Sequence, residues 1–219
     1  MSDVTKFICE EMRALANPSR ASFNRKLLRI KDDSGRVVLG CQMPNLRKIC
    51  KRYSATLSPN EILILLRSNC QEFRQFALLV MIDRFKADPE NIVRLYLDNI
   101  TYVDNWDLVD MSAPKIIGGF YKSTDEIFKR LALDPNLWAN RIAMVATIAF
   151  IGKGQFDLTL QLAEMFMGHG SHFLHKASGW MLREVGKRNG EVLLAFLREH
   201  AAAMPKVMLR YACERLPKE

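Results

Sequence analysis

Apolar residues recur along most of this chain at spacings of three and four, which places them on one face of a helix. The runs at 62–66 and 76–82 show this pattern clearly. Alternation with a period of two is missing over any useful length, and only Val37–Leu39, which follows a turn-forming run at 32–36, has an extended character. The pattern predicts an all-α chain.

Helix starts are marked at four points by a capping residue followed by proline: Asn17-Pro18, Ser58-Pro59, Asp88-Pro89 and Asp134-Pro135. We expect helical segments at 4–15, 19–30, 42–53, 59–67, 70–86, 89–100, 105–111, 114–121, 124–132, 136–151, 155–167, 172–188, 190–199 and 204–216. Many short antiparallel helices joined by short loops are typical of a helical bundle or a HEAT-like α-solenoid. No linker interrupts the pattern, so we expect a single domain over residues 1–219.

The chain carries 32 Lys and Arg against 24 Asp and Glu, a net charge of +8. This excess favours a polyanionic partner, although a basic surface without such a partner gives the same count. The five cysteines are odd in number and lack CxxC spacing, which argues against disulfides and structural zinc and indicates a reducing, cytoplasmic location. We expect no secretory leader, and the apolar run at 142–151 is too short to span a membrane.

An aromatic residue and a carboxylate lie one helical turn apart in the middle of the chain, at Trp106 and Asp110. An indole face attracts cations and a carboxylate is a fixed negative charge, so this pair suits a positively charged ligand. Asp107 and Asp110 also have the spacing of favourable charges in a first helical turn, and for this pair taken alone that is the better interpretation.

The segment 172–188 carries three cations and an indole on one side, with small and apolar residues on the other. The residues of this stripe are Lys176, Trp180, Arg183 and Lys187. A phosphate- and base-contacting stripe would have this composition, and so would a solvated basic face that carries one tryptophan.

Arg141 lies in a segment that is apolar nearly all round, so we expect it to be buried and to need an acidic or phosphate partner. A structural ion pair and an arginine clamp at a groove both satisfy that need. His169, His172 and His175 have no nearby acid or cysteine to complete a metal site, so we expect no metal.

Four motifs together resemble the DNA alkylation repair enzyme family, the AlkD-like DNA glycosylases. They are Asn105-Trp106-Asp107-Leu108-Val109-Asp110 followed by Pro114 and Gly118, Trp138-Ala139-Asn140-Arg141, Lys176-Ala177-Ser178-Gly179-Trp180-Met181-Leu182-Arg183-Glu184, and Leu209-Arg210-Tyr211-Ala212-Cys213-Glu214. Gly40-Cys41-Gln42-Met43-Pro44, with Arg47, resembles the N-terminal pattern of the family. The resemblance extends over nearly the whole chain.

The resemblance implies a curved stack of HEAT-like helix pairs that grips double-stranded DNA in a concave basic groove. It implies a monofunctional glycosylase that excises cationic alkylated purines, such as N3-alkyladenine and N7-alkylguanine, without flipping the base fully out of the duplex. We expect no cofactor, a monomer, and a bacterial cytoplasmic protein that works at the nucleoid. The competing hypothesis is a non-catalytic α-solenoid that binds DNA or a protein partner.

By resemblance, the catalytic aspartate falls on Asp110, the two flanking tryptophans on Trp106 and Trp180, and the phosphate-facing arginine on Arg141. The DNA contacts that we expect are Gln42, Lys176, Arg183 and Lys187. An aromatic residue that some family members place on the opposite DNA strand has no clear counterpart at 25–31, which leaves the contacts to that strand, including Gln42, open.

Overall fold

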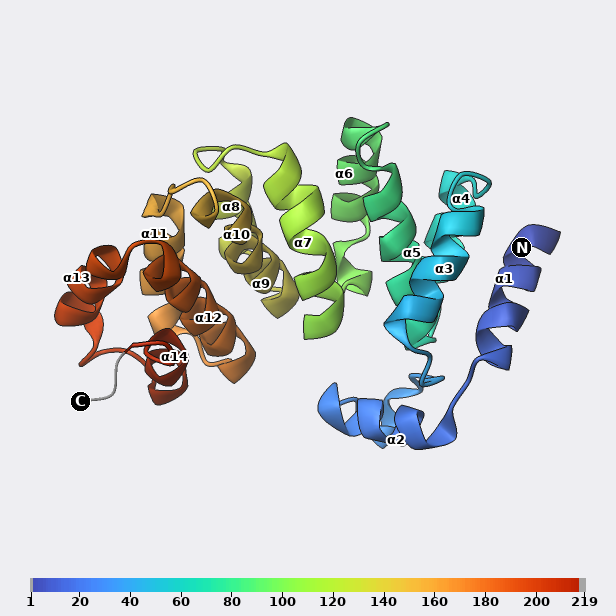
Figure 1. Ribbon diagram of the computed structural model, residues 1–219, viewed down its shortest axis with the longest axis horizontal. Helices are drawn as coiled ribbons and strands as arrows, with labels where there is room; N and C mark the ends of the chain where they lie inside the picture. The colour runs from blue at the N-terminus through green and yellow to red at the C-terminus, as the bar shows by residue number, and fades with distance from the viewer. Residues whose placement is uncertain (1, 217–219) are drawn as a thin grey trace. The chain divides into compact units, whose positions relative to one another are not determined.

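The computed structural model describes residues 2–216 and confirms the all-α prediction, with a solenoid-like succession of short helices (Figure 1). The described residues form two compact units, one ending at Ser112 and the other beginning at Ala113. The boundary falls within a helix, so a single domain remains a prediction. No helix in the described part of the chain is both long and apolar enough to cross a membrane.

The N-terminal unit is built around α5, whose residues are buried along most of its length. The phenylalanine and leucine side chains of α5 pack against α3, α4 and α6, and they form the core of this unit. The helices of the unit are α1 (Asp3–Ala14), α2 (Pro18–Leu27), α3 (Met43–Tyr53), α4 (Pro59–Leu66), α5 (Gln71–Arg84), α6 (Pro89–Asp98) and the first half of α7 (Trp106–Phe120), with short 3-10 helices at Asp32–Ser34 and Ile100–Tyr102.

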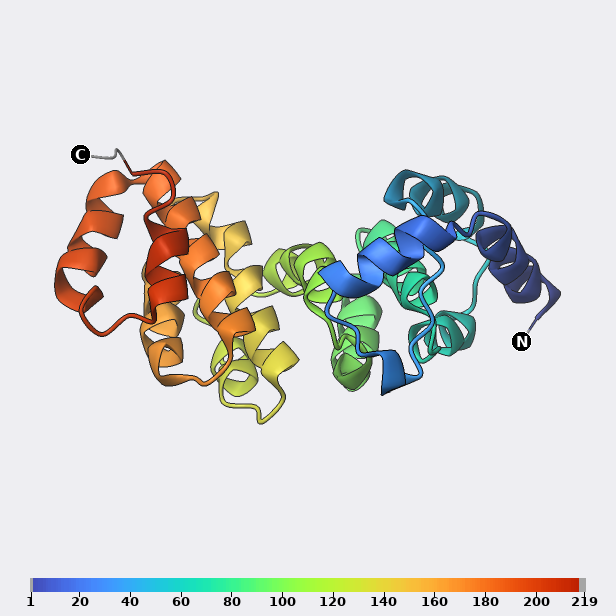
Figure 2. The ribbon, with the colours of Figure 1, turned by 90° about the horizontal axis from the view of Figure 1, so that it is seen from below.

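Helix α2 differs from its neighbours because none of its residues is buried. It lies across the ends of the other helices of the N-terminal unit (Figures 1 and 2). The chain passes close to α2 at Gly40, where an added Cβ would overlap the carbonyl of Asn17. The φ of Gly40 is 78°, a backbone conformation that favours glycine. The amide of Asn17 also donates to the carbonyl of Leu39 (2.8 Å). Backbone contacts therefore hold α2, together with the side chain of Arg25, which donates to the carbonyls of Lys31 and Arg36. Most of the other side chains of α2 are exposed.

The C-terminal unit is built around α12, which packs against α9, α11, α13 and α14. Gly179 allows α14 to approach closely, because a Cβ at this position would overlap the carbonyl of Met208. The helices of the unit are the second half of α7, α8 (Ile127–Ala132), α9 (Leu137–Ala146), α10 (Ile148–Ile151), α11 (Asp157–Met165), α12 (His172–Arg188), α13 (Gly190–His200) and α14 (Lys206–Ala212), with a 3-10 helix at Phe166–Gly168.

Two of the four predicted helix starts are confirmed with their side-chain caps. Asn17 accepts a hydrogen bond from the amide of Arg20 (2.9 Å), and Ser58 forms a complete capping box with Glu61. Asp88 occupies the capping position of α6, but its carboxylate accepts from the side chain of Asn91 instead. The fourth start is wrong by two residues, because α9 is capped by Asn136.

Two expected segments are divided differently in the structure. The segments expected at 105–111 and 114–121 form one helix, α7, with Pro114 inside it. The segment expected at 136–151 is divided at Thr147 into α9 and α10. The extended residues after the turn make one isolated parallel bridge, from Val37 to Cys70. A proline does not end a helix when tertiary packing on both sides fixes the backbone, which explains the continuous α7.

Candidate nucleic-acid interface

A buried ionic network fixes the turn that leads into α7. Asp104 accepts a hydrogen bond from Arg36 (2.6 Å) and lies 2.9 Å from Nη1 of Arg74. Arg74 also donates to the carbonyls of Ser68 (2.7 Å) and Tyr102 (2.9 Å), so it ties α5 to the turn before α7. Two guanidinium groups around one carboxylate leave the turn little freedom.

Asp107 lies in the first turn of α7 and is a structural acceptor. Its carboxylate accepts hydrogen bonds from the side-chain amides of Gln71 (2.9 Å) and Gln75 (2.8 Å), both on α5. Burial raises the pKa of Asp107, and these hydrogen bonds oppose that effect. Asp107 therefore joins α5 to α7, and its carboxylate has a structural role.

Asn105 adds a link between α7 and the exposed helix α2. Its side-chain amide donates to the carbonyl of Leu28 (3.1 Å), at the end of α2, and its side-chain oxygen accepts from the amide of Trp106 (2.7 Å). One buried side chain thus orients both the start of α7 and the end of α2.

Trp106 and Asp110 lie one turn apart on α7 and are both partly exposed. Burial, together with the nearby carboxylate of Asp110, raises the pKa of Tyr96. The hydroxyl group of Tyr96 is fully buried and pairs with that of Ser112 (2.9 Å). Pro114 has no N–H to donate to the carbonyl of Asp110, four residues earlier, so α7 lacks one helical hydrogen bond at this residue.

Gln42 is exposed at the start of α3 and lines an open pocket of about 320 Å³ in the N-terminal unit. Arg20 and Asn24 of α2 and Gln75 of α5 line the same pocket. The structure thus places Gln42 beside the exposed helix α2 and beside a residue that holds Asp107.

Arg141 is buried in α9, with 5% of its surface exposed, as its apolar surroundings predict. Its Nη1 donates a hydrogen bond to the carbonyl of Phe173, at the start of α12. The ring of Phe173 also contacts that of Trp138, with centroids 5.5 Å apart. Arg141 is therefore held at the junction of α9 and α12, within the C-terminal unit.

The predicted division of α12 into a buried and an outer side is confirmed. Its buried residues are Leu174, Ala177, Ser178, Gly179, Met181, Leu182 and Val185, while Lys176, Trp180, Arg183 and Lys187 are all partly or fully exposed. The stripe residues also have acidic partners that the sequence analysis left out. Trp180 Nε1 donates to Glu184 (3.1 Å), and both Arg183 (3.3 Å) and Lys187 (2.8 Å) form ion pairs with the same carboxylate.

Glu184 is therefore the centre of the α12 array, which consists of Trp180, Arg183, Glu184 and Lys187. Burial would raise the pKa of Glu184, but hydrogen bonds and charges from Lys187 and Arg183 outweigh burial and lower it. Arg183 also pairs with Glu214, just beyond α14, while its Nε is buried and has no hydrogen-bond partner. The stripe is a set of balanced charges and is less cationic than its lysines and arginine alone suggest.

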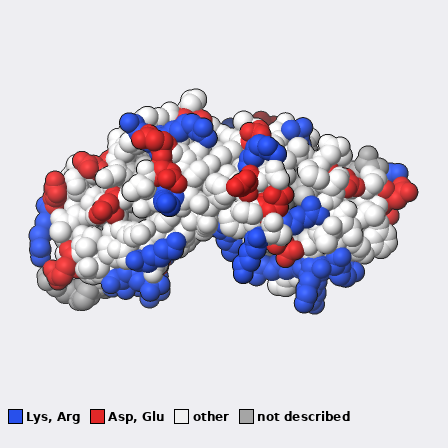
Figure 3. All heavy atoms as spheres, turned by 90° about the horizontal axis from the view of Figure 1, so that it is seen from above, with Lys and Arg blue, Asp and Glu red and all other residues white. Residues whose placement is uncertain are grey.

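Positive side chains also gather along one edge of the N-terminal unit, the right-hand half of Figure 3. Exposed cations in this unit include Arg20, Lys26, Arg47, Lys48 and Lys51 of α2 and α3. The excess of positive charge on the chain is thus present on helices of both units, as binding to a long polyanion requires.

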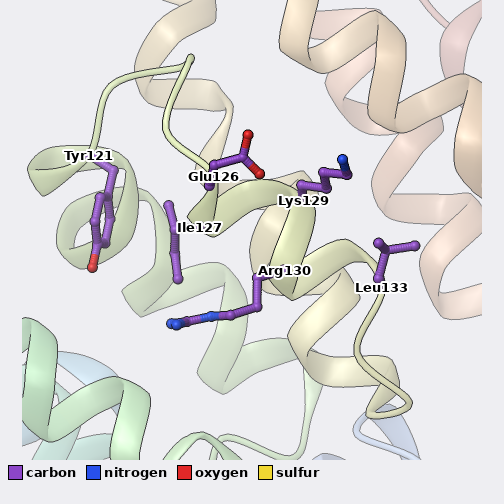
Figure 4. A pocket seen from close by; sticks show the side chains of 6 residues that line it. All are labelled: Tyr121, Glu126, Ile127, Lys129, Arg130 and Leu133. Carbon is purple, nitrogen blue, oxygen red and sulfur yellow. The ribbon is translucent and has the colours of Figure 1, made fainter.

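An open pocket of about 440 Å³ in the C-terminal unit contains none of the predicted site residues (Figure 4). It is lined by Tyr121, Glu126, Ile127, Lys129, Arg130 and Leu133. No group of three or more potential metal ligands lies together anywhere in residues 2–216. The predicted site residues therefore lie outside this pocket, Arg141 buried and the others partly or fully exposed.

Both the N-terminal and the C-terminal unit carry predicted site residues. Gln42, Trp106 and Asp110 belong to the first unit, and Arg141 and the α12 residues belong to the second. Trp106 and Asp110 share α7 in the first unit, and in the second Arg141 contacts the start of α12, the helix that carries the other predicted residues. That Trp106, Asp110, Arg141 and Trp180 face one common surface remains a prediction.

Sequence reasoning missed three residues that hold the site side chains, namely Gln71, Gln75 and Glu184. Glu184 has a sequence signal, because it lies four residues after Trp180 and three before Lys187 on one helix. Gln71 and Gln75 have no such signal, since their partner Asp107 lies more than thirty residues further along the chain.

The described residues define an all-α protein of the solenoid-like class, with tryptophan, carboxylate and basic side chains partly exposed on its helices. A family model of the DNA alkylation repair enzymes matches residues 8–216, and the chain belongs to this family. A solved structure of a predicted DNA alkylation repair enzyme from Enterococcus faecalis is similar, with a TM-score of 0.76 and 19% sequence identity over 93% of this chain and 98% of that one. No curated protein matches the chain. Membership supports an enzyme with a role in alkylation repair.

Proposed function

We propose that the protein is a monofunctional DNA glycosylase that removes cationic alkylated purines, such as N3-alkyladenine and N7-alkylguanine, from duplex DNA. The observation that carries the proposal is the pair formed by Trp106 and Asp110, partly exposed and one turn apart on α7. Asp110 stands where the family resemblance implies the catalytic aspartate, while the neighbouring Asp107 accepts hydrogen bonds from two glutamine side chains of α5.

Alkylation at N3 or N7 gives the purine a positive charge and weakens its bond to C1′ of deoxyribose. As this bond breaks, its electron pair moves to the purine, which leaves as a neutral base, and positive charge develops on the sugar. The carboxylate of Asp110 stabilises that charge and orients a water molecule. The oxygen of the water forms the new bond to C1′, a proton is released, and an abasic site remains.

The other site residues have supporting roles in this proposal. The indoles of Trp106 and Trp180 attract the cationic nucleotide and contact the sugar-phosphate backbone. Arg141 is anchored by the carbonyl of Phe173 and directs its guanidinium group toward a phosphate or an acid. The reaction needs only water as a second reactant, and because the base is not fully flipped out, it needs no deep pocket.

Release of free base from duplex DNA that contains a single 7-methylguanine tests the proposal. We expect wild-type protein to release 7-methylguanine, and Asp110→Asn to slow the release by at least about 100-fold, because one stabilising group of a charged transition state is removed. Duplex binding should change by less than about twofold, since the substitution removes no phosphate contact.

Asp107→Asn is the matched control, because it makes the same chemical change one turn earlier, on a residue with structural partners. It should retain base release at a temperature at which it is folded. Equal rates for wild type and Asp110→Asn would overturn the catalytic role of Asp110. Duplex binding without base release, on both 3-methyladenine and 7-methylguanine, would favour the non-catalytic α-solenoid.

A further inference from the structure

We infer that Glu184 is a positioning residue, which holds Trp180, Arg183 and Lys187 in one array and gives up the two cations when DNA phosphates bind. The inference rests on the proposed function, since it assigns the α12 array to the same DNA-binding surface. It concerns a residue with no part in the chemistry proposed for Asp110.

The geometry places Glu184 at the centre of its neighbours on α12. Its Oε1 accepts from Trp180 Nε1 at 3.1 Å, and it lies 3.3 Å from Nη2 of Arg183 and 2.8 Å from Nζ of Lys187. Oε2 also accepts from Lys187, at 3.0 Å. One carboxylate thus orients an indole and neutralises two cations that would otherwise repel each other.

The exposed fractions of these side chains indicate that a phosphate can replace Glu184 as the partner of a cation. The side chain of Lys187 is 42% exposed, while those of Arg183 and Glu184 are 18% and 19% exposed. Lys187 can therefore turn outward to a phosphate at little cost, since exposed ion pairs are weak. Arg183 is less exposed and has a second ion pair, to Glu214, so we expect it to exchange partners less readily than Lys187.

A carboxylate and a phosphate oxygen are the same kind of acceptor for arginine and lysine. Glu184 therefore competes with DNA phosphates for Arg183 and Lys187, while it keeps the indole of Trp180 in place through the hydrogen bond to Nε1. Removing the carboxylate should have opposite effects on two measurements. Binding to undamaged duplex should become tighter, and base release should become slower.

The variants that separate these effects are Glu184→Gln and Glu184→Ala. Glutamine removes the charge but keeps an oxygen that accepts from Trp180, and alanine removes both. The control is the pair Glu164→Gln and Glu164→Ala, because Glu164 is exposed on α11 of the same unit. It changes the net charge equally at a site away from the array.

Duplex binding as a function of salt concentration is the first measurement. Both variants of Glu184 should bind undamaged duplex a few-fold more tightly than wild type at low salt, with the slope of log K against log salt steeper by roughly one. Both variants of Glu164 should keep the wild-type slope. Equal slopes for the Glu184 and Glu164 variants would overturn the exchange of partners.

Base release and the indole signal are the second and third measurements. Release of 7-methylguanine should fall roughly tenfold in Glu184→Ala and only about threefold in Glu184→Gln, because a misplaced side chain slows a reaction that depends on orientation. In ¹⁵N spectra, with Trp180→Phe for assignment, the Nε1–H resonance of Trp180 should move in Glu184→Ala and stay near its wild-type position in Glu184→Gln.

An unchanged Trp180 resonance in Glu184→Ala would overturn the positioning role, as would equal loss of base release in the two variants. If the wild type releases no base, the proposed function fails, while the salt slope and the indole resonance still decide between a positioning residue and a simple surface charge. Urea unfolding of each variant separates both effects from a loss of stability.

Discussion

On α7 the groups around Trp106 are held by buried partners from other helices, whereas on α12 those around Trp180 are held largely by one another at the surface. Asp107 depends on Gln71 and Gln75 of α5. Glu184 binds residues three and four positions away on its own helix. The same residue types, an indole with carboxylates and cations, are thus fixed in two different ways.

The difference follows from what each helix is proposed to do. A carboxylate that stabilises charge at one carbon atom needs a helix held in a fixed position, and the hydrogen bonds from α5 to Asp107 hold the first turn of α7, one turn before Asp110. Cations that follow a phosphate backbone need only be close and exchangeable, because long-range electrostatic attraction tolerates small displacements. Substitutions near α7 should therefore reduce stability, and those on α12 should alter salt-dependent binding.

The largest effect should come from Arg74→Ala, which breaks the network behind α7. The substitution leaves the carbonyls of Ser68 and Tyr102 without this donor and removes one cation from Asp104. Asp104 is partly exposed and keeps its ion pair with Arg36, so the loss comes mainly from the two buried hydrogen bonds, and we expect about 2 kcal/mol less free energy of unfolding. Urea denaturation measures it.

Arg94→Ala is the control for this change, because Arg94 is exposed on α6 and donates to the side chain of Asn91 in the same helix. It should change the free energy of unfolding by less than about 0.5 kcal/mol. A loss of similar size in both variants would show that the network near Asp104 is no more important than a surface contact.

On α12, Lys187→Ala should weaken duplex binding with little effect on folding. We expect a loss of roughly fivefold in affinity at 0.1 M salt and a salt slope shallower by about 0.9, as for one lost phosphate contact. Titrations of a fluorescent duplex at several salt concentrations give both values. Lys122→Ala, at an exposed lysine before α8, is the control. An equal change in salt slope for this variant would contradict a specific phosphate contact by Lys187.

The comparison also explains which parts of the site could be predicted from sequence. The outer face of α12 and the spacing of Trp106 from Asp110 follow from the helical period alone, and the structure confirms the helices that carry them. The burial of Arg141 followed from its apolar surroundings. These are local properties, because each depends on residues within about two turns.

Long-range pairings could not be predicted, because a hydrogen bond between Gln71 and Asp107 depends on how α5 packs against α7. Pro114 failed as a boundary for the same reason, since the packing of α7 outweighs the helix-breaking tendency of one residue. The partners of Glu184 are predictable from sequence, because Trp180, Arg183 and Lys187 lie within four residues of it on one helix.

A smaller effect is expected at Asp107, where the pKa is raised by burial. A carboxyl group with a raised pKa binds its proton more tightly in the folded than in the unfolded protein. Its contribution to stability is therefore fully present below the ordinary value of 3.8 and is lost as the pH rises through the raised value. Asp107→Asn removes this titration and costs about 1 kcal/mol in lost acceptors.

The measurement is the free energy of unfolding of wild type and Asp107→Asn in urea at a series of pH values above 3.8. The stability advantage of the wild type should shrink as the pH rises. An advantage that grows with pH would contradict the raised pKa and would place the carboxylate in an environment that favours its charge.

The smallest effect is expected at Glu61, which lies outside both regions and calibrates the pH series. Hydrogen bonds from Ser2, Ser58 and Thr5 lower its pKa to about 2. A carboxyl group with a lowered pKa contributes stability above the ordinary value of 4.5, and this contribution is lost as the pH falls through about 2. Glu61→Gln keeps one acceptor oxygen of the capping box, so we expect a loss of only about 0.5 kcal/mol at neutral pH.

The pH dependence at Glu61 therefore has the opposite sign to that at Asp107. The difference in unfolding free energy between wild type and Glu61→Gln should disappear as the pH falls from 4.5 toward 2, while the difference for Asp107→Asn should be largest at the acid end. If both variants lose their effect at low pH, the carboxylate of Asp107 is favoured by its hydrogen bonds more than it is penalised by burial. Gln71 and Gln75 would then stabilise the negative charge of Asp107 in the folded protein.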